Sequence, residues 1–149
     1  MDFPAHLLPD SVLLAPSVSD KWKLLETMVQ AVADSWQLSP EIATSCHQCV
    51  FAREESASTG MEAGIAVPHA AVDGLEQLVI SMALLPKGLE FASLDGKPAQ
   101  VVVLILVPKK EKLIHLQTLT EVARRLANAD FRSELLQASD AADVIRMWS

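Results

Sequence analysis

The chain has 149 residues, of which 50% are hydrophobic and 21% charged, so it is expected to fold as a single globular domain over residues 1–149. Its formal net charge of −7 argues against nucleic-acid binding, which needs a basic face. The longest apolar runs, 77–86 and 100–108, fall short of the roughly 20 residues that span a bilayer. A secretory signal requires basic residues near its start, and no lysine or arginine precedes Lys21. We therefore expect a cytoplasmic protein without membrane insertion.

The first predicted elements are an extended segment and two helices. Prolines interrupt the apolar residues of 6–20, which indicates an edge strand or an extended entry into the fold. A first helix is predicted to begin after Ser19 as its N-cap. A second is predicted to run from Ser39 as N-cap, with Pro40 at the first helical position, to about Glu55. The stripe of apolar side chains on the first helix consists of Trp22, Leu25, Val29, Val32 and Trp36.

Three strand candidates follow a loop of small residues. They are a short run that ends at Pro68, a run over 78–85 and a run over 100–107. The last run is almost continuously apolar, without alternation, which predicts that other layers of structure cover both faces of this strand. Asp95 and Gly96, just before it, are residues typical of a tight turn.

Helical spacing returns at Glu111, and two more short helices are predicted to open near Asp130 and Asp140. Helices, then strands, then helices thus follow one another along the chain. This order predicts an α/β fold of three layers, α/β/α, in which a mixed β-sheet is flanked by helices on both faces. The face of the third helix that is expected to pack on the sheet consists of Leu113, Leu116, Leu119, Val122 and Leu126.

Cys46 and Cys49 form a CxxC pattern, which occurs in redox-active thiols and in zinc sites. The pair lies well inside the second predicted helix, away from the helix N-terminus, where a thiolate gains stability from the dipole. The chain contains 2 cysteines, so no second pair completes a tetrahedral zinc site. We expect both side chains to pack in the core, with a redox or a metal-binding role as the alternatives.

The segment "GIAVPHAA" places His69 directly after the proline that ends a predicted strand. Ligands in open α/β sheets bind beside strand ends. An imidazole is also partly neutral near pH 7, because its ordinary pKa is about 6.5. His69 is therefore a candidate nucleophile or general base, and the alternative is a histidine that hydrogen-bonds a loop carbonyl.

Arg53 and His115 are candidates for the same site. Arg53 lies near the end of the second helix, and is either an exposed helix charge or a clamp for an oxyanion or a phosphate. His115 lies in the first turns of the third helix, and is either a packed or solvated side chain or a partner of His69. Two imidazoles, a guanidinium and nearby backbone amides suit the transient handling of a phosphoryl group, so we expect no cofactor and no metal ion.

The run "PKKEK" puts Lys109, Lys110 and Lys112 at the start of the third predicted helix. Cations are locally unfavourable there, because the N-terminus is the positive end of the helix dipole. The run is either a solvated basic turn or a site that receives an anion or an acidic partner surface, and the sequence leaves both open.

The stretch "REESASTGMEAGIAVPHA" resembles the active-site signature of the fructose/mannitol-type (type 2) enzyme IIA domain of the bacterial phosphoenolpyruvate-dependent phosphotransferase system (PTS). Residues 94–138, which include a histidine–leucine pair that opens a helix, are similar to the same family. The likeness extends over nearly the whole chain. It implies a mixed sheet between helical layers and a phosphotransferase component that carries phosphohistidine.

The resemblance implies a role for each of the three candidate residues. His69 is implied to accept a phosphoryl group from the histidine-containing phosphocarrier protein, Arg53 to hold the phosphate or the partner, and His115 to assist. The acceptor is then either the cysteine of a IIB protein, for sugar uptake, or a regulatory target protein, as in the nitrogen-regulatory IIA branch. Because the chain shows no IIB domain and no transmembrane part, we favour the regulatory branch.

Apolar residues near His69 are expected to form a docking rim for the partner, namely Met61, Ala70, Ala71 and Val72. Two positions depart from the family pattern: many members have a basic residue in place of Ala71 and a polar one in place of Ala63. These departures bear on phosphate binding and partner preference. The alternative to a carrier is a regulatory binding domain with a degenerate site that is not phosphorylated.

Overall fold

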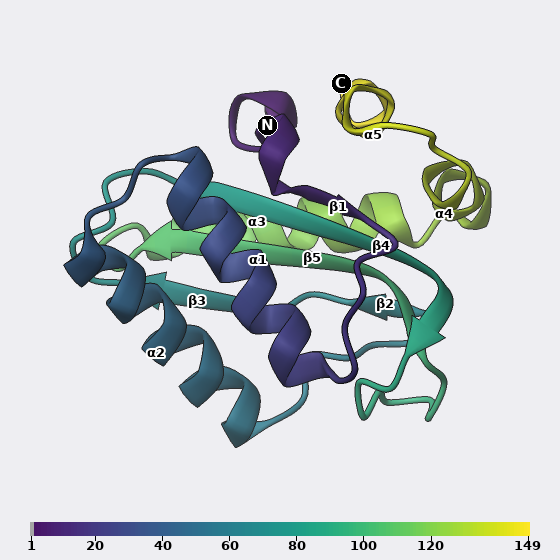
Figure 1. Cartoon of the computed structure of the whole chain (residues 1–149), viewed down its shortest axis with the longest axis horizontal. Helices are drawn as coiled ribbons and strands as arrows, with labels where there is room; N and C mark the ends of the chain where they lie inside the picture. Colours follow the sequence, from purple (N-terminus) through teal and green to yellow (C-terminus); the bar gives the residue numbers. More distant parts are fainter. Residues whose placement is uncertain (1) are drawn as a thin grey trace.

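The computed structural model describes residues 2–149, and its five strands form one mixed sheet between layers of helices (Figure 1). The strands are β1 (Val12–Leu14), β2 (Ile65–Ala66), β3 (His69–Val72), β4 (Val79–Leu89) and β5 (Ala99–Pro108). The helices are α1 (Lys21–Ser35), α2 (Pro40–Ser56), α3 (Lys112–Leu126), α4 (Ala129–Leu136) and α5 (Ala141–Met147), with 3₁₀ turns η1 (Phe3–Ala5) and η2 (Pro9–Ser11). In Figure 1, α1 and α2 lie on one face of the sheet and α3 lies behind it, which confirms the predicted three-layer α/β/α class.

Capping side chains fix where the first two helices begin. Ser39 accepts a hydrogen bond from the backbone N–H of Ile42 at 3.3 Å, as predicted. The first helix differs from the prediction, because Asp20 and not Ser19 is its N-cap, and Asp20 Oδ1 accepts from the N–H of Lys23 at 2.9 Å. A carboxylate at this position also interacts favourably with the positive end of the helix dipole, which a serine hydroxyl does only weakly. None of the helices between residues 2 and 149 combines the length and hydropathy that crossing a bilayer requires.

The sheet is organised around β5. On one side β4 runs antiparallel to it, and β1 completes that edge by pairing parallel to β4. On the other side β2 and β3 pair with β5 one after the other, both in parallel, so they act as a single edge strand interrupted at Val67 and Pro68. The edge position predicted for the N-terminal segment is thereby confirmed in β1.

The connection between β4 and β5 spans residues 90–98 and contains the turn predicted at Asp95 and Gly96. β4 continues to Leu89, beyond its predicted end at Leu85, because Leu89 still pairs with Ala99 after a register irregularity. The chain turns at Gly96, whose N–H donates to Ser93 O at 3.0 Å and whose φ of 74° suits a residue without a Cβ.

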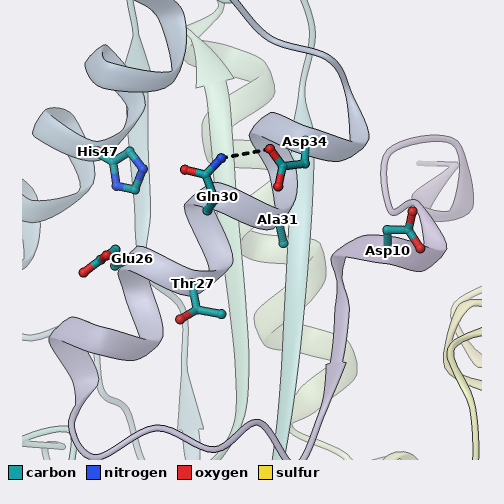
Figure 2. Close-up of a pocket in the computed structure, with 7 residues that line it drawn as sticks. All are labelled: Asp10, Glu26, Thr27, Gln30, Ala31, Asp34 and His47. Carbon is teal, nitrogen blue, oxygen red and sulfur yellow. Dashed lines mark hydrogen bonds between the residues drawn. The ribbon is translucent and has the colours of Figure 1, made fainter. Parts of the chain in front are cut away.

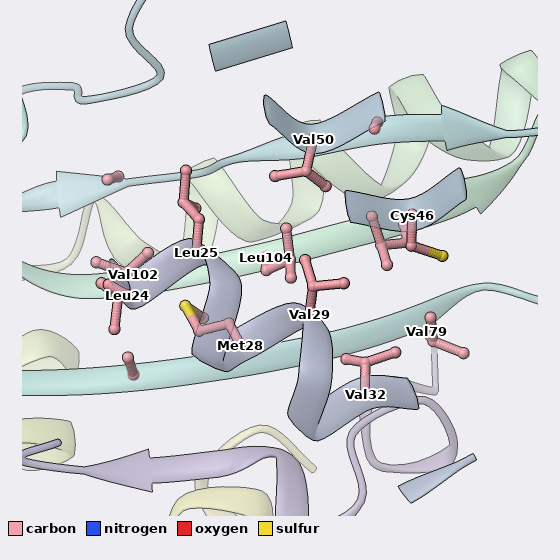
Figure 3. Packing of buried hydrophobic residues seen from close by; sticks show 14 of the residues in the cluster. Leu24, Leu25, Met28, Val29, Val32, Cys46, Val50, Val79, Val102 and Leu104 are labelled. Carbon is pink, nitrogen blue, oxygen red and sulfur yellow. The ribbon is translucent and has the colours of Figure 1, made fainter. Parts of the chain in front are cut away.

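Each face of the sheet has its own hydrophobic core. Val102, Leu104 and Leu106 of β5 belong to the core beneath α1 and α2, while the alternate residues Val103 and Ile105 belong to the core beneath α3, α4 and α5. The predicted burial of both faces of this strand is therefore confirmed. Figure 3 labels residues of the first core: Leu24, Leu25, Met28, Val29, Val32, Cys46, Val50, Val79, Val102 and Leu104.

The predicted apolar face of α3 is wrong in its first two turns. Leu113 is 68% exposed and Leu116 is 62% exposed, whereas the buried residues of α3 are Thr118, Val122 and Leu126. Successive residues of a helix differ by about 100°, so Leu113 lies about 140° around the axis from Thr118. A stripe built from steps of three residues therefore winds away from the sheet, and the true face continues through steps of four.

Leu25 and Leu113 give a paired test of this packing. Leu25→Ala removes a side chain that is 0% exposed and is expected to lower the free energy of unfolding by about 2–5 kcal/mol, because it leaves a cavity between α1 and the sheet. Leu113→Ala is expected to change it by no more than about 0.5 kcal/mol. Urea titrations of both variants measure the difference, and a loss at Leu113 as large as that at Leu25 would contradict the observed orientation of α3.

Candidate functional site

His69 reaches its position through a break in the edge strand. The sequence indicated that a strand ends at Pro68 and that His69 follows it; instead, β2 ends at Ala66 and His69 is the first residue of β3, opposite Ile105 of β5. The reason is that Pro68 keeps its carbonyl in the ladder, where it accepts from Ile105 N–H at 3.0 Å. Proline therefore interrupts the pairing for two residues without ending it, and His69 is held by the sheet itself.

Residues 59–61, on the outer side of this edge strand, form hydrogen bonds with the segment that precedes His69. Val67 N–H donates to Thr59 O at 3.1 Å and Met61 N–H donates to Ile65 O at 2.7 Å, so 59–61 and 65–67 form a small antiparallel pair. Gly60 lies in the middle of this pair, and a Cβ there would meet the Ser93 Oγ at 2.6 Å and its Cα at 2.8 Å. The segment 59–61 is thus pressed between the strand that leads to His69 and the β4–β5 connection.

The imidazole of His69 is held in one tautomer. Its Nδ1 lies 2.8 Å from the carbonyl oxygen of Val67. A carbonyl only accepts hydrogen bonds, so Nδ1 must carry the proton and donate it. In the neutral ring, Nε2 then keeps an unprotonated lone pair, which is the nucleophilic form of the nitrogen.

His115 packs edge-on against His69, as the sequence reasoning proposed. The ring centroids are 5.1 Å apart and the rings are inclined at 83°. Burial is the largest influence and lowers the pKa of His69; the hydrogen bond to the Val67 carbonyl opposes it, the Arg53 guanidinium lowers the pKa further, and the Glu54 carboxylate raises it slightly. Burial also lowers the pKa of His115, with further contributions from His69 and Arg53. Both imidazoles are therefore predominantly neutral at pH 7.

Arg53 comes from the last turn of α2. Its Nη1 donates to the carbonyl of Ala57 at 2.7 Å, which keeps the guanidinium at the end of the helix. It lines both hollows that flank His69, so the structure brings Arg53, His69 and His115 together. A half-buried guanidinium beside two neutral imidazoles offers positive charge and N–H donors to an anion.

Two hollows meet at His69 and Arg53. One, of about 280 Å³, extends towards α3 and the β4–β5 connection; its other lining residues are Ser58, Thr59, Gly60, Met61, Val67, Leu94, Leu119 and Ala123. The other, of about 430 Å³, opens between α2 and α3 and is lined also by Cys49, Ala52, Ala70, Ala71 and His115. Of the four residues expected to form the docking rim, Met61 and Ala71 are half-buried lining residues. Ala70 is only 6% exposed but still lines the second hollow, whereas Val72 is 0% exposed and lines neither hollow, so the expectation is wrong for Val72.

A buried ion pair beside the site escaped the sequence reasoning. Glu54, 3% exposed, accepts hydrogen bonds from the backbone N–H of Thr59 at 2.8 Å and from its hydroxyl at 2.5 Å. Lys21 of α1 completes the group, with Nζ 3.1 Å from Glu54 Oε2. The available signal was the position of Glu54 within the apolar stripe of α2, between Val50 and the loop, where a charge requires a partner.

The two cysteines differ in their surroundings. Cys46 is fully buried in the core under α2, and burial, followed by the neighbouring Cys49, raises its pKa from 9.0 to about 11, so it stays a protonated thiol. Cys49 is half-buried and lines the second hollow at His69. The expected core position is therefore confirmed for Cys46 and only partly for Cys49. Among residues 2–149, no three side chains of His, Cys, Asp or Glu are placed to hold a metal ion.

The lysine run lies apart from His69. Lys109, Lys110 and Lys112 line a hollow together with Asp73 and Glu76, so carboxylates face the same space. The cations are thus partly balanced, which favours a solvated turn over an anion site.

Another hollow, of about 570 Å³, lies on the outer side of α1. Figure 2 shows His47 of α2 facing the side chains of α1 across it, and the hydrogen bond from Gln30 Nε2 to Asp34 Oδ1, which is 2.8 Å long. Its charged lining residues are Asp10, Glu26 and Asp34. It is larger than the hollows at His69, but no lysine or arginine is among its lining residues, and it shares no residue with them.

Comparison with known proteins places this geometry in a family. Residues 5–149 match the family described as the phosphoenolpyruvate-dependent sugar phosphotransferase system, EIIA 2. The protein belongs to this type-2 enzyme IIA family, whose members are components of a phosphotransfer system. The family resemblance stated from the sequence is thereby confirmed.

The similar proteins include both nitrogen regulatory and sugar-specific proteins. The chain is 31% identical over 135 residues to a nitrogen regulatory protein of Pseudomonas aeruginosa, covering 91% of this chain and 86% of that protein. It is 37% identical over 92 residues to the fructose-specific EIIA component of Haloferax volcanii, covering 62% of this chain and 60% of that protein. The crystal structure of the nitrogen regulatory protein IIA-Ntr from Neisseria meningitidis superposes with a TM-score of 0.88 at 27% identity, covering 98% of both chains.

The coupling of the two imidazoles to Arg53 can be measured directly. Arg53→Gln is expected to raise the pKa of both His69 and His115, because it removes a positive charge that disfavours protonation of each ring. Burial, the largest cause of the lowered pKa in both rings, remains in the variant. Ring proton shifts followed by NMR against pH measure this. Arg124→Gln, the same charge change at an exposed position of α3, is the control; titration midpoints that move equally in both variants would contradict the assignment.

Proposed function

We propose that the protein is a phosphocarrier of the phosphotransferase system that accepts a phosphoryl group on Nε2 of His69. The observation that carries the proposal is the hydrogen bond from His69 Nδ1 to the Val67 carbonyl, which leaves Nε2 as the unprotonated nitrogen. The lowered pKa of His69 supports it, because a neutral ring is the form that attacks phosphorus. The family to which the chain belongs supplies the class of reaction.

The transfer needs few protein groups. The Nε2 lone pair of His69 attacks the phosphorus in line, the new N–P bond forms, and the bond from phosphorus to the donor's nitrogen breaks as its electron pair returns to that nitrogen. The proton on Nδ1 stays in its hydrogen bond to Val67 throughout, so no base has to remove it. Reversal of the same steps passes the group to an acceptor, which is what a carrier requires.

In this proposal, Arg53 and His115 balance the negative charge of the phosphoryl group. The phosphoryl group brings two negative charges to a half-buried site, and Arg53 offers N–H donors to its oxygens. His115, whose ring contacts His69 edge-on, orients that ring and donates to a phosphoryl oxygen when its own ring N–H faces the group. The donor we propose is the histidine-containing phosphocarrier protein.

For the acceptor we favour a regulatory target protein over a IIB protein. The match covers 86% of the nitrogen regulatory relative and 98% of the IIA-Ntr structure, whereas it covers 60% of the fructose-specific EIIA component. The higher identity of 37% within that shorter match is the observation that keeps sugar uptake through a IIB cysteine as the second candidate. We propose that the protein acts in the cytoplasm, where such partners operate.

A phosphorylation assay tests the carrier role. Wild-type protein is incubated with labelled phosphoenolpyruvate, enzyme I and the histidine phosphocarrier, and the expected label is acid-labile and alkali-stable, as a phosphohistidine is. His69→Ala is expected to abolish the label, and His115→Ala to slow its appearance by about 100-fold, the size of a typical general-acid contribution. His47→Ala, which changes a histidine in the separate hollow of Figure 2, is the matched control and is expected to label as the wild type does.

Each other outcome has a definite meaning. Label that persists on His69→Ala would show that His69 is not the phosphoryl acceptor, and His115 would be the next candidate. A wild-type protein that accepts no label from donors of its own organism would support the alternative of a binding domain that is not phosphorylated.

The pH dependence of labelling follows from the lowered pKa. Above pH 6.5 the His69 ring is neutral and the rate is expected to be flat; the rate is expected to fall only as pH drops below 6.5, when protonation of Nε2 removes the lone pair. Initial rates between pH 5 and 8, with donor protein in excess and already phosphorylated, measure this limb. A rate that begins to fall above pH 7 would contradict a buried, neutral nucleophile.

A further inference from the structure

The buried carboxylate of Glu54 has more contacts than a stabilising ion pair needs. Its side chain is 1% exposed and receives three donors: the Thr59 backbone N–H, the Thr59 hydroxyl and the Lys21 ammonium. The Thr59 contacts are 2.8 and 2.5 Å long, within the range of strong charge-assisted hydrogen bonds. Glu54 therefore fixes the start of the segment 59–61 to the last turn of α2.

Thr59 passes this constraint on to His69. The carbonyl of Thr59 accepts the N–H of Val67 at 3.1 Å, and the carbonyl of Val67 accepts Nδ1–H of His69 at 2.8 Å. A continuous series of hydrogen bonds thus runs from Glu54 through Thr59 and Val67 to the imidazole. The links pass through the backbone of Thr59 and of Val67, so the series transmits position: Glu54 fixes Thr59, and Thr59 fixes the strand segment whose carbonyl orients the His69 ring.

Lys21 makes this arrangement compatible with an anionic substrate. An unpaired carboxylate at the position of Glu54 would repel a phosphoryl group arriving at His69. The Lys21 side chain is only 14% exposed, and its Nζ lies 3.1 Å from Glu54 Oε2, so the charge is neutralised by a residue of a different helix. The rings of Trp22 and Phe91, with centroids 5.0 and 5.2 Å from Nζ, hold the ammonium in place.

We propose that Glu54 is a positioning residue for phosphoryl transfer: through Thr59 and Val67 it locks His69 in the tautomer whose Nε2 is free, and its pairing with Lys21 keeps that lock from repelling the phosphoryl group. The effect on the rate rests on the proposed carrier function, whereas the effect on the tautomer does not. Glu54 touches neither the reacting nitrogen nor the phosphoryl group.

The charged and titratable groups that act on the His69 ring come from the two helices beside it. Arg53 and Glu54 face it from α2, and His115 faces it from α3. Burial has the largest influence and lowers the pKa of His69, while the Glu54 carboxylate works in the opposite direction. Removing that negative charge is therefore expected to lower the pKa of His69 further, through the electric field alone, so the tautomer of His69 is the readout that reports its positioning.

Glu54→Gln tests the proposal with little change of shape. The amide oxygen can still accept from the Thr59 N–H and from Lys21, which both bond Oε2, but an NH₂ donor replaces Oε1 as the acceptor of the Thr59 hydroxyl, and the negative charge is lost. In ¹⁵N-labelled protein at pH 8, the ring nitrogens of His69 are expected to report a mixture of tautomers, against Nδ1–H alone in the wild type. The titration midpoint of His69 is expected to move to lower pH, and the initial rate of phosphorylation by the phosphorylated donor protein to fall about tenfold. Glu55→Gln, a change of the exposed neighbour, is the matched control.

The outcomes separate this proposal from the proposed function. A folded Glu54→Gln protein with wild-type tautomer, titration midpoint and rate would overturn the positioning role. If wild-type protein accepts no phosphoryl group but the tautomer and the midpoint shift as stated, the carrier function fails and the positioning of His69 stands. If circular dichroism shows Glu54→Gln to be unfolded, Thr59→Val, which deletes only the hydroxyl donor, takes its place; an unchanged tautomer there overturns the proposal.

Discussion

The burial of β5 on both faces is the constraint on which the rest of the structure depends. A strand whose alternate side chains enter separate cores has no face left for water, so helices must cover both sides and the strand must pair on both edges. β4 fills one edge completely, while β2 and β3 fill the other with an interruption. The site lies at that interruption because it is where the chain leaves the ladder and returns to it.

The same constraint explains why the candidate residue His69 is both rigid and accessible. His69 is fixed by its backbone pairing to Ile105 and by its ring contact with Val67, yet the outer edge of β3 and the space between α2 and α3 leave it half-exposed. Loops give access with mobility, and buried strands give rigidity without access. The first residue of an edge strand, after a proline, combines rigidity and access.

The sequence contains strong signals for elements and weak ones for orientation. The almost continuously apolar run of β5 predicted a doubly covered strand, because no other environment accepts so many adjacent apolar residues. Ser39 likewise predicted the start of α2, because its side-chain cap is a local interaction. The face of α3 could not be predicted in the same way, since its leucines fit more than one stripe and only contact with the sheet selects among them.

Arg53, His69 and His115 were candidates from sequence, but their meeting depends on how α2 and α3 pack around one edge. Glu54 was missed because its partners Lys21 and Thr59 lie on other segments.

The interrupted edge strand has a consequence for association. Exposed edges of β-sheets recruit the edges of other molecules and so lead to aggregation, and long, regular edges do so most readily. Here the edge is divided into strands of two and four residues, Pro68 separates them, and residues 59–61 already pair with the first of them. The break at which His69 lies therefore also leaves only short, interrupted edges for the sheet of a second copy of the protein to extend.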